Sequence, residues 1–229
     1  MITVARFFED PWWLDFAKRI IRLPLKAIYY SWLRLHPDYP WLTYGAIRWL
    51  KRHLHPSMVG FEWGSGRSTL FFAQRVHKLY TVEHDRQWYE TVRQMIQQAQ
   101  LQDKVDLILI PPHKPAFDPA KPRTPWWAQS GYVPGKPQYA QYADAILQFP
   151  DAFFDFIVVD GRERVSCLLN AEPKLKPGGF LLLDNAERRE YQPGILPYRT
   201  WRRLDFSNGL TISSIFLKPS QDAGAKTLF

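Results

Sequence analysis

The sequence predicts an α/β fold built on a doubly wound sheet of parallel strands. Three short apolar runs that each end in polar residues read as buried strands: MVGFEWG (58–64), KLYTVEHD (78–85) and VDLILI (105–110). Two further runs, FDFIVV (154–159) and GFLLL (179–183), are continuously apolar, as in strands that are covered on both faces. Strands that alternate with helices pair in parallel through right-handed crossovers.

Segments with helical spacing of apolar residues connect these strands. Residues 70–76 and 86–101 follow the first and second strands, and residues 139–148 precede the fourth. A short helix is expected between the fourth and fifth strands. This order of elements supports the parallel sheet.

The composition is that of a globular protein with a basic excess. The 229 residues are 46% hydrophobic and 23% charged, which excludes a disordered or collagen-like chain. No uncharged apolar stretch reaches about 18 residues, so a membrane-spanning helix is excluded. The net charge of +8 suggests nucleic acid, a membrane surface or an acidic substrate as partner. Nucleic acid is not expected, because zinc-finger spacing, an RNP-like strand and long basic runs are missing.

Cysteine usage and the first residues bear on the compartment. The single cysteine, Cys167, cannot form an intramolecular disulfide and is interpreted as a small buried apolar residue. Glu9 and Asp10 stand where an export signal needs an apolar core. We therefore expect a cytoplasmic protein.

The basic excess lies mainly in the N-terminal quarter, so we expect a basic, Trp-rich helical extension over 1–57 and an α/β domain over 58–229. Residues 1–58 hold nine Lys/Arg, four Asp/Glu and five of the ten Trp. Residues 11–35 mix basic and apolar side chains at roughly helical spacing, interrupted by Pro24. Such a segment is typical of a pair of interfacial helices at a membrane, or of a helical cap whose charges are solvated.

The strongest functional signal lies where the first two strands end. Gly64 and Gly66 permit a tight turn close to a ligand, and the following helix begins with free N–H groups. Glu83 ends the second strand, where a carboxylate accepts hydrogen bonds from ribose hydroxyls. A dinucleotide fingerprint needs a third glycine where Thr69 stands, and Glu62 would repel a pyrophosphate. S-adenosylmethionine, which carries a sulfonium and an ammonium, suits this acidic turn better than a nicotinamide dinucleotide does.

Four motifs, taken in order, resemble those of the class I S-adenosylmethionine-dependent methyltransferases: VGFEWGSGRST, YTVEHD, FDFIVVDG and LKPGGFLLLDN. The resemblance covers about residues 58–185 and implies a Rossmann-like sheet of seven strands whose last two form a hairpin. Residues 197–206 and 211–217 are expected to form that hairpin, with its turn at 207–209.

The resemblance also implies a cofactor site. The residues assigned to it are Glu62, Gly64, Ser65, Gly66, Ser68, Glu83 and His84. The glycine turn would line the methionine part, Glu62 would lie near the ammonium, Glu83 would hold the ribose and His84 would lie beside the adenine. The alternative is that Glu62 and Glu83 are solvated carboxylates at strand ends.

Two more strand ends bring oxygen ligands to the same crevice. Asp160, Asp184 and Asn185 suit Mg²⁺, which would orient an acceptor hydroxyl and lower its pKa, as in the similar metal-dependent O-methyltransferases. Alternatively, Asp160 is a general base or a cofactor neighbour, and the other two residues cap the next helix. Arg162 and Arg164 would disfavour a dication; they suit an acidic substrate, or ion pairs with neighbouring acids.

Residues 111–138 form a proline-rich insertion within the α/β domain. They hold eight of the nineteen prolines, and loops of this length are usually functional or disordered. We expect an ordered lid whose Trp126 and Trp127 wall the acceptor pocket, because a stiff chain loses less entropy when it orders.

Together the patterns predict methyl transfer from S-adenosylmethionine to an oxygen of a small or glycan-type acceptor of negative charge, with Asp160 as the catalytic residue. Oxygen is expected because carboxylates are the available activators. The residues after the fourth strand lack the Asn-Pro-Pro-Tyr-like segment that would indicate amino-methylation of nucleic acid bases. The alternatives are a nucleotide-fold protein that binds without catalysis, and a membrane-associated scaffold.

The membrane hypothesis has a direct test. If residues 11–35 form an interfacial anchor, the full-length protein should sediment with liposomes that contain anionic lipid, because basic side chains and apolar area both contribute to binding. A variant that lacks residues 1–35 should stay in the supernatant. If the full-length protein does not sediment, the membrane hypothesis is wrong, and the interpretation of the segment as a helical cap remains.

Overall fold

The computed structural model describes most of the chain and divides it into two compact units. The described residues are 24, 27–36, 39–113 and 137–220. The units comprise residues 1–37 and 38–229. In the first unit, residues 27–35 are helical. Most of segment 11–35, together with Trp126 and Trp127, lies outside the described residues.

The boundary between the units lies at residue 37, whereas the sequence analysis placed it at 57. The difference is helix α2 (Tyr44–His53), which belongs to the α/β unit because its apolar face, Ala46, Ile47 and Leu50, is buried. Its basic residues lie on the opposite face, so composition alone grouped it with the N-terminal extension.

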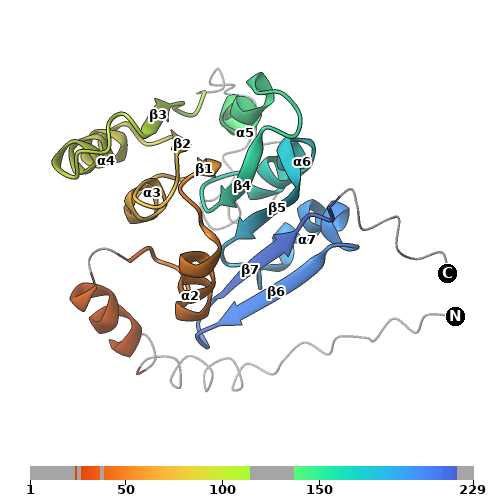
Figure 1. The fold of residues 1–229 in the computed structure, drawn as a ribbon, viewed down its shortest axis with the longest axis horizontal. Coiled ribbons are helices and arrows are strands. Elements are labelled where there is room, and N and C mark those ends of the chain that lie inside the picture. The colour runs from red at the N-terminus through yellow and green to blue at the C-terminus, as the bar shows by residue number, and fades with distance from the viewer. Residues whose placement is uncertain (1–23, 25–26, 37–38, 114–136, 221–229) are drawn as a thin grey trace, which may run out of the picture. The chain divides into compact units, whose positions relative to one another are not determined.

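One seven-stranded sheet forms the centre of the second unit (Figure 1). Its strands are β1 (Val59–Trp63), β2 (Lys78–Glu83), β3 (Val105–Leu109), β4 (Phe154–Val159), β5 (Leu175–Leu183), β6 (Arg202–Ser207) and β7 (Ile212–Leu217). Their order is β3-β2-β1-β4-β5-β7-β6. β1 to β5 pair in parallel, and β7 is antiparallel to both β5 and β6. The predicted doubly wound sheet with a final hairpin is confirmed.

Helices cover both faces of this sheet, with α3 and α4 on one side and α5 and α6 on the other (Figure 1). Their bounds are α3 (Arg67–Ala73), α4 (Arg86–Gln98), α5 (Ala140–Asp144), α6 (Arg164–Lys174) and α7 (Gln192–Ile195). Short 3₁₀ turns are η2 (Pro137–Tyr139), η3 (Ala145–Gln148), η4 (Arg189–Tyr191) and η5 (Leu196–Tyr198). No helix in the described residues combines the length and apolar character that crossing a bilayer requires.

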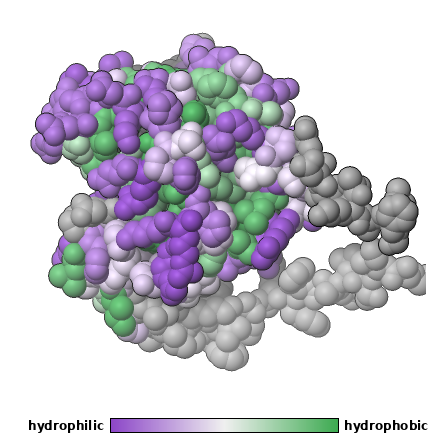
Figure 2. Space-filling model, in the orientation of Figure 1, coloured by the Kyte–Doolittle hydropathy of each residue, from purple (hydrophilic) through white to green (hydrophobic). Residues whose placement is uncertain are grey.

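The core lies between the sheet and its helices, while the surface seen in Figure 2 is mainly hydrophilic. In β4 and β5, Ile157, Val159 and Leu181 are fully buried, which explains the continuous apolar runs of these strands. The two ends of the proline-rich insertion are joined by a backbone hydrogen bond, in which His113 N donates to Gln138 O at 2.8 Å. Residues 114–136 between them lie outside the described part.

Strand order decides where a ligand can bind. β1 pairs with β2 on one side and β4 on the other, so the chain direction of the crossovers reverses at β1. In open parallel sheets a crevice forms at that reversal, outside the carboxyl ends of the strands.

Gly60 of β1 provides a test of the packing. An added Cβ would lie 2.1 Å from Cζ of Phe156, whose ring stacks on Phe180 at 5.5 Å. Gly60→Ala should therefore lower the free energy of unfolding by about 1–3 kcal/mol in urea titrations, because the buried ring has little room to move. In a Phe156→Ala background the same change should cost less, since the space is then free. An equal cost in both backgrounds would contradict the packing argument.

Candidate active site

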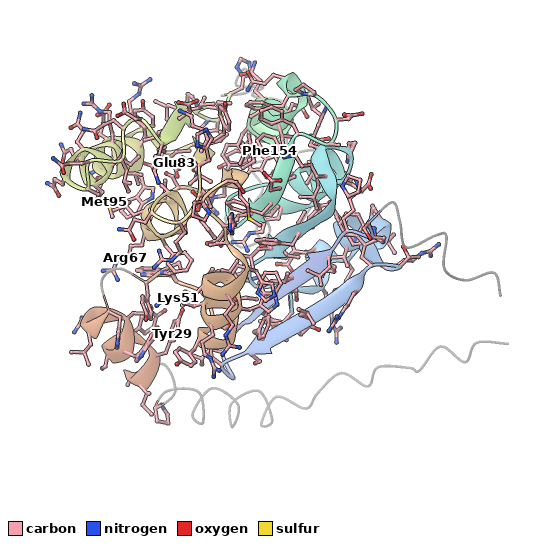
Figure 3. The ribbon with its side chains drawn as sticks, in the orientation of Figure 1. Tyr29, Lys51, Arg67, Glu83, Met95 and Phe154 are labelled. Atoms are coloured by element: carbon pink, nitrogen blue, oxygen red, sulfur yellow. The ribbon has the colours of Figure 1, made fainter. Side chains whose placement is uncertain are left out.

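A cavity of about 610 Å³ lies at the carboxyl ends of the strands. Its walls come from the turn after β1, the end of β2 with the start of α4, the loop after β4, Arg188 beyond β5 and Trp41 before α2. Figure 3 shows Glu83 at the end of β2 and Arg67 at the start of α3. The ends of β1, β2 and β4 share this cavity as the sequence predicts, whereas Asp184 and Asn185 at the end of β5 do not line it.

Two glycines in contact bring the ends of β1 and β4 together. Gly64 has φ 93°, and an added Cβ would lie 2.8 Å from the backbone of Gly161. A Cβ on Gly161 would in turn lie 1.9 Å from the Tyr142 hydroxyl. Backbone hydrogen bonds from Gly64 N to Val82 O and from Asp160 N to Trp63 O, both 3.0 Å, extend the sheet to this point. Any side chain at either glycine would separate the two turns or displace the tyrosine.

Glu62 lies beneath the glycine turn and does not line the cavity. It is fully buried, and its Oε2 accepts hydrogen bonds from Thr69 Oγ1 at 2.6 Å and Thr81 Oγ1 at 2.8 Å. Thr69 Oγ1 in turn accepts from Gly66 N at 2.9 Å. Thr69, which stands where a dinucleotide fingerprint has its third glycine, thus connects the Glu62 carboxylate to the backbone of the glycine turn.

The other carboxyl oxygen of Glu62, Oε1, is buried and makes no hydrogen bond within the described residues. Burial raises the pKa of Glu62 to about 7, although the Ser68, Thr69 and Thr81 hydroxyls favour the ionised form. An unpartnered buried carboxylate oxygen is suited to a water or a cationic group.

Glu83 fixes the turn from the other side. Its Oε2 accepts from Ser65 N at 3.2 Å and Ser65 Oγ at 2.9 Å, and its Oε1 accepts from His84 N and Asp85 N. Burial acts to raise the pKa of Glu83, but hydrogen bonds from His84, Asp85 and Ser65 together hold it below its usual value. A ribose hydroxyl at Glu83 would therefore take the place of the Ser65 hydroxyl. Asp85 also lines the cavity and offers a second carboxylate there.

His84 lies between Glu83 and Arg162. Its Nδ1 is 2.8 Å from Glu83 Oε1, and its Nε2 accepts from Arg162 Nε at 3.3 Å. The ring also contacts Tyr139 and Tyr142 edge-on, with centroids 5.7 and 5.8 Å away.

Arg164 is buried and connects the ends of β4 and β5. Its Nη2 donates to Asp160 Oδ1 and Asp160 O, both at 2.9 Å, and its Nε donates to Gly161 O at 3.0 Å. Its Nη1 donates to Asp184 O. Four of its five N–H groups are engaged within the fold. Arg164 therefore fixes the loop and does not act as the fork for an acidic substrate that the sequence suggested.

The neighbouring carboxyls are strongly affected by burial. Burial raises the pKa of Asp160, against the opposing charges of Arg164 and Arg188. Burial, reinforced by the charge of Asp160, raises the pKa of Asp184 to about 7. Asp160 lines the cavity, whereas Asp184 Oδ1 accepts from Ser213 Oγ of β7 at 2.8 Å.

The predicted magnesium site at Asp160, Asp184 and Asn185 is not supported. Arg164 contacts both aspartates, and its charge would repel a dication. Asn185 Nδ2 donates to Thr211 Oγ1 at 2.7 Å, away from Asp160. The described residues contain no group of three or more His, Cys, Asp or Glu able to hold a metal ion. The alternative that Asp184 and Asn185 cap a helix fails as well, since their side chains bond to β7 and the residue preceding it.

Several cavity residues escaped the sequence analysis. These are Trp41, Arg67, Asp85, Trp88 and Arg188. Arg188 could have been found, because it follows the end of β5 as Arg162 follows the end of β4. Trp88 Nε1 donates to Ser65 O at 2.8 Å, a contact that only the folded chain reveals.

The strand order, the glycine turn after β1 and the acidic end of β2 define a class I methyltransferase. A family model described as a methyltransferase domain matches residues 61–186, more than half of the chain. The chain therefore belongs to this family of methyltransferase domains. No curated protein sequence matches it.

Solved structures agree in fold at low sequence identity. A methyltransferase-like protein from Silicibacter pomeroyi is 19% identical with a TM-score of 0.51, covering 76% of this chain and 86% of its own. A candidate methyltransferase from Streptococcus mutans, solved with SAH, is 11% identical with a TM-score of 0.53, covering 76% and 95%. A methyltransferase from Geobacter sulfurreducens is 15% identical with a TM-score of 0.53, covering 86% and 90%.

Glu62 gives the site a distinctive pH response. Its folded-state pKa of about 7 lies above the ordinary 4.5, so the folded protein binds the proton more tightly than the unfolded chain does. Its contribution to stability should be complete below about pH 4.5 and be lost as the pH rises to about 7, by on the order of 3 kcal/mol. Urea titrations at several pH values should show this loss in the wild type, and a loss smaller by that amount in Glu62→Gln, where Asp184, whose pKa is also raised to about 7, still makes its own contribution. Glu90→Gln, at a partly exposed position on α4 whose carboxylate pairs with Arg93 at the surface, is the control, and an unchanged pH slope in Glu62→Gln would contradict the assignment.

Proposed function

We propose that this protein transfers a methyl group from S-adenosylmethionine to a hydroxyl oxygen of a small or glycan-type acceptor, with Asp160 receiving the acceptor's proton. The observation that carries the proposal is the position of Asp160. It directly follows β4, lines the cavity beside the glycine turn and is oriented by Arg164 at 2.9 Å. Its raised pKa makes its carboxylate a stronger base than an exposed aspartate.

The residues present fit the cofactor. The turn of Gly64 and Gly66 lets a ligand approach the backbone, and Glu62 beneath it supplies an acidic group with one unpartnered oxygen. Asp85 and Glu83 would hold the ribose, and His84 would border the adenine. When bound, S-adenosylmethionine supplies a methyl group activated by its sulfonium.

The chain's own contribution is positioning, exclusion of water and removal of one proton. Arg164 holds the Asp160 carboxylate facing the cavity, and Tyr142 fixes the loop by its contact with Gly161. Oxygen is the favoured acceptor atom because the carboxylate is the base that the cavity offers close to the glycine turn.

Asp160→Asn tests the role of the carboxylate. The amide keeps the shape and an acceptor for Arg164 but cannot take a proton, so methyl transfer should fall by about 10²–10⁴-fold. Affinity for S-adenosylmethionine, measured by calorimetry, should stay within a few-fold. Transfer is measured with a radiolabelled methyl group on a mixture of phenols, hydroxy acids and sugars.

The control and the contrary outcomes are distinct. Asp103→Asn removes an exposed carboxylate outside the cavity and should leave transfer unchanged. Full transfer by Asp160→Asn would remove the base from the mechanism, and label found on nitrogen would overturn O-methylation. Binding of S-adenosylmethionine without methyl transfer to any of these acceptor classes would favour a non-catalytic binding protein.

A further inference from the structure

The two ends of the cavity differ in charge. Glu83 and Asp85 stand at the end of β2, where the glycine turn is held. At the ends of β4 and β5 the lining residues include Arg162 and Arg188. Both acids at the end of β2 thus lie on the side proposed for the cationic cofactor, with Arg67 at the start of α3, whereas Arg162 and Arg188 lie on the side of Asp160.

The two arginines are not neutralised by the fold. Arg162 Nε donates to the ring nitrogen His84 Nε2 at 3.3 Å, and Arg188 Nη1 donates to the Tyr191 hydroxyl at 3.3 Å. In the described part of the chain neither forms an ion pair with a carboxylate. Arg164, between them in the sequence, is paired with Asp160 at 2.9 Å. Two guanidinium groups that line the cavity are therefore without an ion-pair partner among the described residues.

Both arginines flank the proposed base. Arg162 lies two residues beyond Asp160 in the loop after β4, and Arg188 lies in the segment after β5, the strand next to β4. The charge of Arg188 also acts on Asp160, although the two are not within ion-pair distance. A guanidinium binds carboxylate or phosphate through two parallel N–H groups, which gives both affinity and orientation.

Apolar surface lies at the same cavity. The Trp41 side chain lines it and remains 59% exposed. An exposed indole beside unneutralised arginines suits a ligand that has both an acidic group and a ring or hydrocarbon part.

We propose that Arg162 and Arg188 bind an acidic group, a carboxylate or a phosphate, of the methyl acceptor and thereby orient its hydroxyl toward Asp160. This inference rests on the proposed function, because it assigns the second half of the same cavity. The competing source of an oxyanion is the carboxylate of the cofactor itself. The test separates these two sources.

The experiment uses the full chain saturated with S-adenosylhomocysteine. Calorimetry measures binding of benzoate, of inorganic phosphate and of benzamide, which matches benzoate in shape without its charge. In Arg162→Gln and in Arg188→Gln, benzoate and phosphate should each bind about tenfold more weakly, because one charge-assisted fork is lost. Benzamide binding and the affinity for S-adenosylhomocysteine should change by less than about twofold. Arg199→Gln, an exposed arginine outside the cavity, removes the same charge and should change none of them.

Three results would overturn the proposal. One is a loss of S-adenosylhomocysteine affinity in the two cavity variants, which would assign the arginines to the cofactor. Another is an equal loss of anion binding in Arg199→Gln, which would show a general charge effect. The third is that wild-type protein binds neither anion better than benzamide. If the wild type does not bind S-adenosylhomocysteine at all, the proposed function fails, and anion titrations of the protein alone still decide the role of the arginines.

Discussion

The site depends on one buried cation. The Arg164 guanidinium joins Asp160, Gly161 and the backbone of Asp184, and so fixes the ends of β4 and β5 in one arrangement. Gly161, held in this way, contacts Gly64, and the glycine turn is placed in consequence. A buried guanidinium is stable only with such a set of acceptors, and removing it would leave the Asp160 carboxylate without its ion-pair partner and the Asp184 carbonyl without its donor. The same side chain therefore stabilises the loop and orients the proposed base.

The acids next to the glycine turn act first on the protein itself. Glu62 holds the turn from below through Thr69, and Glu83 holds it from the side through Ser65. Both carboxylates thus organise the backbone that a cofactor would meet. Their spacing in the sequence follows from this geometry, since β1 and β2 are neighbours whose carboxyl ends meet at one edge of the sheet. A ligand that enters the site would exchange some of these contacts for its own.

Charge is distributed along the cavity in a way that the net charge does not show. Much of the +8 excess lies in residues 1–58, and the cavity itself combines acidic groups near β2 with arginines near β4 and β5. A cationic cofactor and an anionic acceptor would each find the opposite charge on their own side. Because Arg164 forms an ion pair with Asp160, fewer arginine charges are available to a ligand than the sequence suggests.

Local patterns determined the strands, the glycine turn and the acids at strand ends, because each depends on residues adjacent in the chain and on the fixed direction of parallel strands. Patterns could not place α2, whose burial depends on β6 and β7 far along the chain. They also could not distinguish Arg162 from Arg164, which differ by two positions: both line the cavity, but only Arg164 is buried and paired with Asp160. The magnesium hypothesis failed for the same reason: the residue types were suitable, but Arg164 contacts both aspartates. Packing between segments that are distant in the chain decides which side chains meet across the strand ends. That packing exists only in the tertiary structure.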